Sequence, residues 1–107
     1  MGLKLILDKI AEINNGGYPV VLMGDFNMNP ADYTLREVEA AMCNARKTAE
    51  KTDNVGTYNN WGKSSEVIDH IYFTGFSACP EFQTITKKYA DRKFISDHYP
   101  VMALFRF

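Results

Sequence analysis

Three short polar motifs, each adjoining an apolar run, constrain the fold of this chain more than any other feature. They lie at 24–27 (Gly-Asp-Phe-Asn), 68–72 (Ile-Asp-His-Ile-Tyr) and 96–101 (Ser-Asp-His-Tyr-Pro-Val). The first motif follows a predicted strand, the second opens one and the third precedes one. If these strands run antiparallel, their polar ends meet at the same edge of a sheet. The sequence therefore predicts acids, an amide and an imidazole along one rim.

The apolar spacing predicts two helices. Residues 3–13 place apolar side chains at helical spacing, with charged residues on the other face. A second helix is expected to begin at Asn29, an N-cap residue type, and to turn Leu35, Val38 and Met42 inward. Both segments therefore have an apolar side that is expected to be buried.

Four segments have strand patterns, and the long polar segment 51–66 is predicted to be a loop. The strands are expected at 19–23, 67–73, 82–89 and 101–107, the third being the weakest. The first run is uninterrupted and rich in valine, which is typical of a strand covered on both faces. Helices beside three or four strands indicate the α/β or the α+β class.

The composition indicates one globular domain, with 107 residues and 46% hydrophobic content. The 12 basic and 13 acidic side chains nearly cancel, so no overall field favours nucleic acid or an anionic membrane. The basic residues within 87–93 are either a solvated surface segment or a patch that steers phosphate toward 96–98. Cys43 and Cys79 lie far apart without zinc-site spacing and are expected to be reduced. No apolar stretch approaches the roughly 20 residues of a membrane span.

Asp25 and Asn27 form the first candidate pair for chemistry. A carboxylate two residues from a carboxamide suits water activation, because the acid accepts a proton or orients the nucleophile while the amide holds it. An ordinary turn is the alternative, since both residue types favour turns and helix caps.

Asp69 is the second candidate because it shares its predicted strand face with Ile71 and Phe73. A carboxylate on an apolar face is costly unless a partner bonds to it, and the expected partner is a histidine. Such a hydrogen bond orients the imidazole and favours the imidazolium, which can stabilise a phosphate oxygen. Backbone amides or Lys63 are the alternative partners.

Asp97 and His98 are the third candidate pair. Adjacent residues of an extended segment face opposite ways, so Asp97 can bind magnesium while His98 points at the substrate. The alternative is a pair that only caps a loop. His70 projects to the face opposite Asp69, and we expect it to pack in the core or to face solvent.

In this order and at these spacings, the three motifs resemble the endonuclease/exonuclease/phosphatase superfamily, which has the deoxyribonuclease I-like fold. The similarity runs from the first helix to Phe107, but it covers only the C-terminal half of a family domain. The resemblance implies that residues 1–107 form a single partial domain, half of a four-layer α/β sandwich. It implies one mixed, mainly antiparallel sheet with two main helices on one face, at the border of the α/β and α+β classes.

The resemblance also implies an activity and a role for each motif residue. Family members are hydrolases of phosphate esters, such as nucleases, phosphodiesterases and phosphatases, and they use Mg²⁺ or Mn²⁺. Asp25 resembles the water-activating or metal-bound aspartate, and Asn27 resembles the asparagine that orients water and phosphate. Asp69 resembles the support of the catalytic histidine, Asp97 resembles a metal ligand, and His98 resembles the histidine that contacts the phosphate.

Four further residues have expected places near this site. Tyr72 and Ser96 resemble neighbours that shape it. Tyr58 and Trp61, in the long loop, either stack on a base or anchor the loop on the core. The substrate is open among DNA, RNA, phosphoinositide, sphingomyelin and smaller phosphoesters.

Part of the active site is expected to lie outside this chain. The family's upstream asparagine, metal-binding glutamate and middle histidine or tyrosine belong to the N-terminal half of the domain. We therefore expect the chain to be inactive alone and to expose an apolar sheet face, which that half or a second copy of the chain covers. The alternative function is a non-catalytic half-domain that acts as an interaction or dimerisation module.

Overall fold

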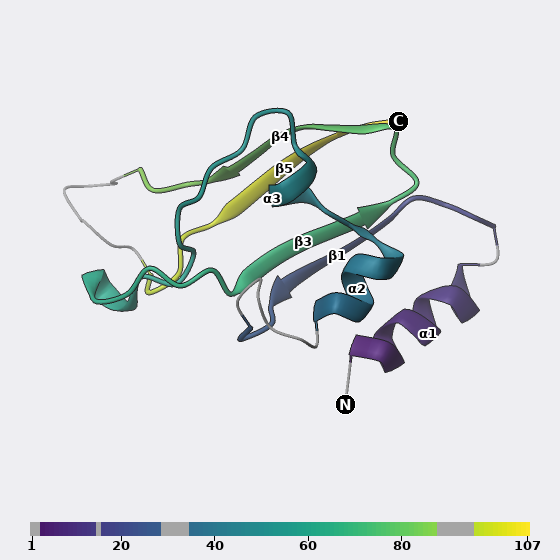
Figure 1. The fold of residues 1–107 in the computed structure, drawn as a ribbon, viewed down its shortest axis with the longest axis horizontal. Coiled ribbons are helices and arrows are strands. Elements are labelled where there is room, and N and C mark those ends of the chain that lie inside the picture. Colours follow the sequence, from purple (N-terminus) through teal and green to yellow (C-terminus); the bar gives the residue numbers. More distant parts are fainter. Residues whose placement is uncertain (1–2, 15, 29–34, 88–95) are drawn as a thin grey trace.

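The computed structural model describes residues 3–14, 16–28, 35–87 and 96–107. Their elements, in chain order, are α1 (Leu3–Ile13), β1 (Val20–Asp25), α2 (Leu35–Ala41), β2 (Cys43–Asn44), α3 (Ala45–Thr48), the 3-10 turn η1 (Asn60–Gly62), β3 (Asp69–Thr74), β4 (Ala78–Thr84) and β5 (Val101–Arg106) (Figure 1). The expected Asn29 cap lies outside the described residues, as do the basic residues of 87–93 other than Lys87. Within the described ranges, none of the helices combines the length and apolar character needed to span a membrane.

The strands pair as two antiparallel sheets, one with the order β1-β3-β2 and one formed by β4 and β5. The predicted α/β class with mainly antiparallel strands is confirmed. The arrangement differs in one respect, because β5 joins β3 through side chains and not through the ladder of a single sheet. Phe73 of β3 and Phe105 of β5 place their ring centroids 4.8 Å apart.

β4 begins earlier than the expected strand 82–89 and ends at Thr84. The start of this strand is hard to predict because it contains Pro80. Proline has no amide hydrogen to donate to a ladder, so its presence in a sequence indicates that a segment is not a strand. The structure accommodates it with an irregular register between Ala78 and Glu81.

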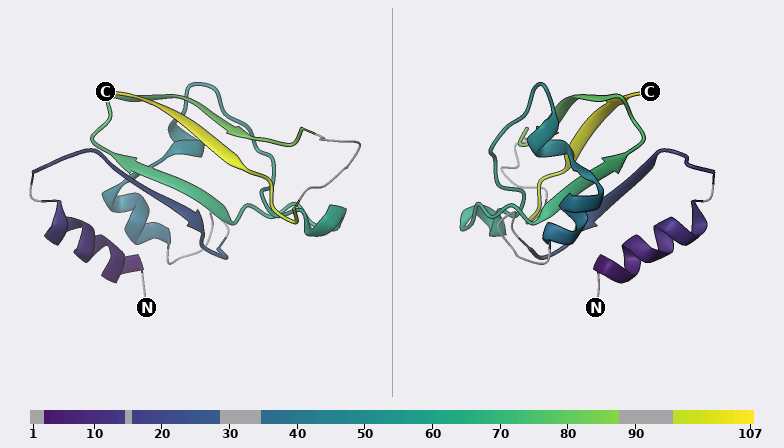
Figure 2. Two further views of the ribbon diagram at one scale, coloured as in Figure 1. Left: turned by 180° about the vertical axis from the view of Figure 1, so that it is seen from behind. Right: turned by 45° about the vertical axis from the view of Figure 1, so that its right-hand side comes forward.

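One core lies between the helices and β1–β3, and the inner side of α2 fills it as predicted. Leu35 and Val38 are fully buried, Met42 is nearly so, and they pack with Tyr72 of β3. The helices α1 and α2 lie on the same side of the β1–β3 pair (Figures 1 and 2). Apolar burial on this side positions the strands whose ends carry the polar motifs.

A second core lies between β3, α3 and the β4–β5 pair. Its buried members are Ala45, Ile71, Phe73, Cys79 and Phe82. The alternation of β3 is therefore as predicted, since neighbouring residues of this strand enter different cores. Both cysteines are free thiols, as expected, with Cys43 exposed and Cys79 buried.

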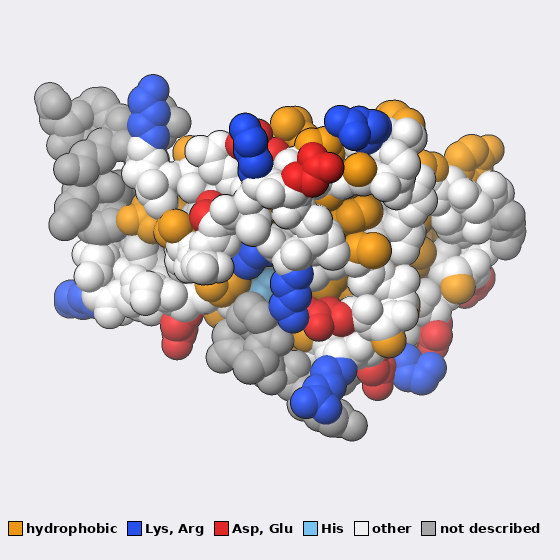
Figure 3. Space-filling view, turned by 45° about the horizontal axis from the view of Figure 1, so that its top comes forward, with side chains coloured by type: hydrophobic (Ala, Val, Ile, Leu, Met, Phe, Trp, Pro, Cys, Tyr) orange, Lys and Arg blue, Asp and Glu red, His pale blue; other side chains and the backbone are white. Residues whose placement is uncertain are grey.

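The expectation that β1 is covered on both faces is wrong. Val20 and Leu22 pack against the core formed with α2, which we call the helix-side core. Val21 is 41% exposed and Met23 is 68% exposed on the opposite face. An uninterrupted apolar run indicates that both faces of a strand favour burial. In the described part of the chain, only one face of β1 is covered by other residues. Hydrophobic side chains are visible at the molecular surface in Figure 3.

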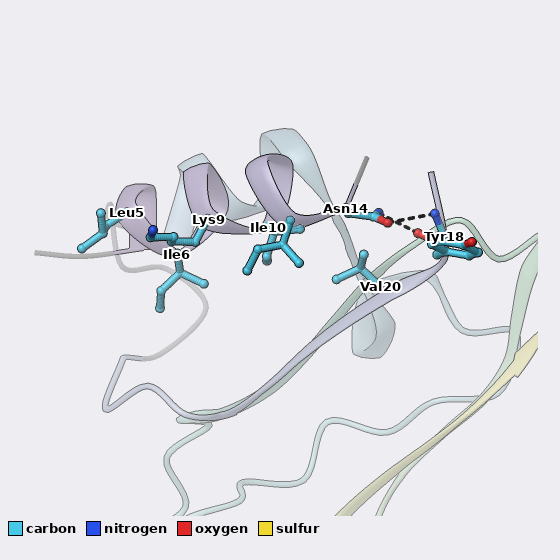
Figure 4. A pocket seen from close by; sticks show the side chains of 8 residues that line it. Leu5, Ile6, Lys9, Ile10, Asn14, Tyr18 and Val20 are labelled. Carbon is cyan, nitrogen blue, oxygen red and sulfur yellow. Dashed lines mark hydrogen bonds between the residues drawn. The ribbon is translucent and has the colours of Figure 1, made fainter. Parts of the chain in front are cut away.

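An apolar groove of about 550 Å³ lies between α1 and the start of β1. Its lining residues are Leu5, Ile6, Lys9, Ile10, Ile13, Asn14, Tyr18 and Val20 (Figure 4). Two hydrogen bonds close its end, because the Asn14 side-chain amide donates to the Tyr18 carbonyl (2.8 Å) and the Tyr18 backbone amide donates back to Asn14 Oδ1 (2.9 Å). This reciprocal pair orients α1 along the strand that follows it.

A buried ion pair attaches the long loop to the strands. Arg46 of α3 donates to Asp53 Oδ1 (3.1 Å) and to Thr84 Oγ1 (3.1 Å), and the Thr84 amide donates to Asp53 Oδ2 (2.7 Å). The Arg46 side chain is only 11% exposed, and its guanidinium carbon lies 4.7 Å from the centre of the Phe82 ring. Burial opposes ionisation of Asp53, but the Thr84 and Arg46 interactions outweigh it and lower the pKa of this carboxyl. The loop is therefore fixed where it leaves α3.

We expect Asp53→Ala to lower the free energy of unfolding by about 2–3 kcal/mol, because it leaves the Arg46 guanidinium buried without its carboxylate. Urea denaturation followed by circular dichroism measures this loss. Asp8→Ala is the matched control, since the Lys4–Asp8 pair is 73% and 65% exposed and such pairs contribute less than ~1 kcal/mol. Equal effects of the two substitutions would contradict a structural role for Asp53.

Candidate active site

The register of β1 with β3 brings the first two polar motifs together. Asp25, the last residue of β1, pairs with Asp69, the first residue of β3. The Phe26 amide extends the ladder by donating to the Ile68 carbonyl (3.0 Å). Because the two strands are antiparallel, the end of one is the start of the other, as the motif order predicts.

His98 joins the two aspartates. Its Nδ1 lies 2.8 Å from Asp69 Oδ2, and its Nε2 lies 3.7 Å from Asp25 Oδ2. A carboxylate can only accept, so Nδ1 carries a proton and donates it to Asp69, which leaves Nε2 facing Asp25. The histidine partner expected for Asp69 is therefore present. The Nε2–Asp25 separation is within ion-pair range but too long for a direct hydrogen bond.

The charge distribution favours the imidazolium form of His98. Its hydrogen bond to Asp69 raises the pKa of the imidazole, burial lowers it, and the charges of Asp69, Asp25 and Asp97 raise it further. The net effect is a raised pKa. The pair thus stabilises the fold fully below the unfolded-state pKa of the histidine, and this contribution is lost as the pH rises through the folded-state pKa.

Backbone contacts hold the His98 segment against the long loop. The Tyr99 amide donates to the Thr57 carbonyl (2.7 Å), and the Asn59 amide donates to the Asp97 carbonyl (2.7 Å). The His98 amide donates to Ser96 Oγ (3.2 Å), which agrees with the expectation that Ser96 shapes the site. The imidazole therefore approaches Asp69 from a segment that is bonded on both sides of it.

Thr57 is a positioning residue that the sequence did not single out. It is fully buried, and its Oγ1 accepts from the backbone amides of Ile68 (3.1 Å) and Asp69 (3.0 Å). The same residue bonds the His98 segment through its carbonyl, so it links both ends of the Asp69–His98 pair. The only available signal was the length of the loop, since nothing periodic marks a single threonine among polar neighbours.

Asn27 occupies a tight turn at the end of β1. Its φ is 54°, and its backbone amide donates to Asp25 Oδ1 (2.9 Å). The turn expected as the alternative to a functional pair is therefore real, and it leaves Asn27 exposed next to Asp25. One carboxylate oxygen of Asp25 orders the turn, and the other faces His98.

Asp97 does not join the central group. In the part of the chain that the structure describes, the acidic and histidine side chains whose ligand atoms lie within 4.8 Å of one another are Asp25, Asp69 and His98. Asp97 is not a member of this group of three, and its expected role as a metal ligand stays a prediction.

Two other residues of the second motif serve the helix-side core. His70 is 3% exposed, its Nε2 contacts the Met28 carbonyl, and burial lowers its pKa. Its predicted packing role is confirmed. Tyr72 is fully buried on the same side, so the expectation that it shapes the site is wrong. The alternation along β3 places Tyr72 on the face opposite Asp69.

The sequence profile of the Endonuclease/Exonuclease/phosphatase family matches residues 3–98. This chain belongs to the endonuclease/exonuclease/phosphatase family. The match includes all three polar motifs up to His98. Members of this family are phosphoesterase-type hydrolases. The resemblance that the three polar motifs indicate is therefore confirmed. A search of curated proteins finds no matching sequence.

Solved structures that share this fold include two of the endonuclease/exonuclease/phosphatase family. A mannosyl-6-phosphatase of Bacteroides thetaiotaomicron aligns with a TM-score of 0.84 and 24% identity, over 100% of this chain and 48% of that protein. An endonuclease/exonuclease/phosphatase family protein of the same organism aligns with a TM-score of 0.81 and 23% identity, over 96% of this chain and 46% of that protein. An endonuclease/exonuclease/phosphatase from Bacteroides vulgatus aligns with a TM-score of 0.78 and 29% identity, over 94% of this chain and 40% of that protein. The chain therefore spans less than half the length of each, which fits the expected partial domain.

We expect Asp69→Asn to lower the pKa of His98 toward its ordinary value, because the substitution removes the charge that stabilises the imidazolium. The chain has only two histidines, so NMR titration of their ring protons in metal-free buffer resolves both. His70 is the internal control, since burial dominates its pKa and it should shift much less. An unchanged pKa of His98 would contradict the proposed pairing.

Proposed function

We propose that the protein to which this chain belongs is a Mg²⁺- or Mn²⁺-dependent hydrolase of phosphate esters, and that the chain contributes part of its active site. The observation that carries the proposal is the Asp25–His98–Asp69 array at the end of the β1–β3 ladder. In it, an oriented imidazole with a raised pKa faces an exposed carboxylate across 3.7 Å. Such an array suits an anionic phosphoester, since the imidazole can donate a proton to it and the carboxylate can orient the attacking water.

The carboxylates of this chain fit a partial magnesium site. Asp25 has a 39% exposed side chain and offers a hard oxygen ligand beside His98. Magnesium takes about six oxygen ligands and commonly keeps several waters, with only one or two carboxylates. Asp97 is the second candidate ligand, although it stands outside the central group. A bound divalent ion supplies Lewis-acid polarisation of a phosphoryl oxygen.

The chain's own residues then divide the remaining work. His98, held by Asp69, directs Nε2–H at a phosphoryl oxygen, where charge develops in the transition state. Asp25 binds the ion or orients the attacking water. Asn27, fixed by the turn that Asp25 caps, presents an amide beside that water and the phosphate. Each of these groups acts through orientation, which is effective only when the strand ends are held rigidly.

We also propose that the isolated chain is inactive. It offers two candidate metal-binding carboxylates, and it covers only 48%, 46% and 40% of the three structural neighbours. The missing ligands, including the expected glutamate, would come from the N-terminal half of the domain. Loss of positioning groups removes most catalysis even where the water-activating residues persist.

We expect hydrolysis of a generic phosphodiester or phosphomonoester in the complete domain with Mg²⁺ or Mn²⁺, and none after chelation. Asp25→Asn and His98→Gln should each reduce kcat by roughly 10²–10⁴-fold, the range of general acid–base and oxyanion contributions. Asp8→Asn on α1 is the control and should retain full activity. Comparing the 107-residue chain with the complete domain tests whether the site is composite. Unchanged rates in both site variants would refute the proposal.

A second candidate function is association through the uncovered face of β1. Val21 and Met23 expose apolar surface on this strand, and β1 is the edge of its sheet in the described residues. An exposed apolar face favours packing against another apolar surface. We propose that the N-terminal half of the domain covers this face in the parent protein, and that a second copy covers it when the chain is alone.

We expect the isolated chain to sediment as a dimer, and Met23→Lys to shift it toward the monomer because a charge cannot be buried cheaply in the interface. Leu5→Lys is the control, since Leu5 is 56% exposed on α1, away from this face of β1. Analytical ultracentrifugation measures both. A stable monomer of the unsubstituted chain would exclude the dimer.

A further inference from the structure

The turn η1 contains the most unusual backbone among the described residues. Asn60 and Trp61 have φ values of 44° and 56°, and Gly62 follows with 97°. Glycine adopts such values readily, but a bulky residue such as tryptophan does so at a cost in free energy. Strained conformations of this kind persist only where the surrounding structure determines them.

Asn59 is the residue that determines this turn. It is 3% exposed, and its Oδ1 accepts from the Trp61 amide (2.8 Å). Its Nδ2 donates to the Ser96 carbonyl (3.1 Å), and its backbone amide donates to the Asp97 carbonyl (2.7 Å). The turn is thus bonded directly to the two residues that precede His98.

Trp61 is exposed although this framework holds its backbone. Its exposed fraction is 57%, so the expectation that it anchors the loop on the core is wrong. Tyr58 lies closer to the site, with its ring centroid 5.1 Å from that of His98. In the fold, η1 lies toward the end of the molecule where β1 ends and β3 and β5 begin (Figure 1). The chain therefore keeps a large aromatic surface in solvent, on a turn that Asn59 bonds to the two residues before His98.

We propose that Trp61 stacks on a ring in the alcohol half of the phosphoester substrate. The inference rests on the proposed function, because a phosphate held at His98 must direct its alcohol half outward over the adjoining surface. Aromatic side chains stack on the faces of other rings, and a turn whose backbone is already fixed loses little freedom when it binds a ligand. Exposed Lys63, two residues further on, adds a positive charge next to this surface.

The ring belongs to a small phosphoester, either a sugar or a nucleobase, and not to a long nucleic acid. A polynucleotide site requires many cationic contacts with phosphates. This chain has a formal net charge of −1, and its candidate site is rich in carboxylates. Recognition of a single ring needs only a local stacking surface.

The kinetic test uses the complete domain with glucose 6-phosphate, 5′-AMP and glycerol 3-phosphate as substrates. Trp61→Ala should raise KM about tenfold, equivalent to ~1.4 kcal/mol, for whichever ring-bearing substrate stacks, with kcat unchanged. KM for the ring-free glycerol 3-phosphate should not move, and Trp61→Phe should restore most of the affinity. The two ring-bearing substrates distinguish a sugar from a base. Unchanged KM values, or an equal rise for glycerol 3-phosphate, would overturn the inference.

Tyr18→Ala is the matched control, because Tyr18 is also an exposed aromatic residue but lies before the start of β1, far along the strand from Asp25. It should leave every KM unchanged. Thermal unfolding of each variant shows whether the turn remains folded. A Trp61→Ala effect that Tyr18→Ala reproduces would also overturn the inference.

A binding measurement separates this inference from the proposed function. Trp61 is the only tryptophan of the chain, so the intrinsic fluorescence of the 107-residue protein reports on its surroundings. If no substrate is hydrolysed, the proposed function fails, and titration with the same three compounds decides the inference alone. Quenching by a ring-bearing compound but not by glycerol 3-phosphate supports it, and no response to either ring-bearing compound overturns it.

Discussion

The antiparallel pairing of Asp25 with Asp69 is the constraint on which the candidate site depends. Two carboxylates directly opposite each other in a ladder repel, so the pairing needs a compensating positive charge. His98 provides it, with one ring nitrogen bonded to Asp69 and the other facing Asp25. The same arrangement that removes a local electrostatic cost therefore orients the imidazole between the two carboxylates. Stability and chemistry at this edge have a common origin.

The long loop turns three separate chain segments into one site. Thr57 joins the start of β3 to the His98 segment, and Asn59 joins that segment to the turn that carries Trp61. The Arg46–Asp53 pair fixes the loop at its other end. The loop lacks regular strand or helix over most of its length, yet buried hydrogen bonds hold both of its ends. The geometry of this loop is thus set by individual polar contacts, whereas the geometry of a strand is set by its hydrogen-bonded ladder.

Much of the fold could be predicted from the sequence because it depends on periodicity. The helix 3–13, the inner side chains of α2 and the meeting of the strand ends all follow from spacing and from motif order. The exposed face of β1, which includes Met23, could be expected only from the partial family resemblance, because an apolar run alone does not reveal whether its cover belongs to the same chain. The roles of Thr57 and Asn59 were also hidden, because single polar residues in an aperiodic loop carry no spacing.

The edge position of β1 has a consequence for how firmly the site is held. A strand with a ladder neighbour on only one side, as β1 has among the described strands, opens more readily than a central strand. Its last residue is Asp25, so local fraying begins close to the group that the chemistry needs most. Any segment that pairs with this edge does more than bury apolar surface. It also suppresses the local opening that would otherwise separate Asp25 from His98. The pairing that completes the sheet therefore also fixes the geometry of the site.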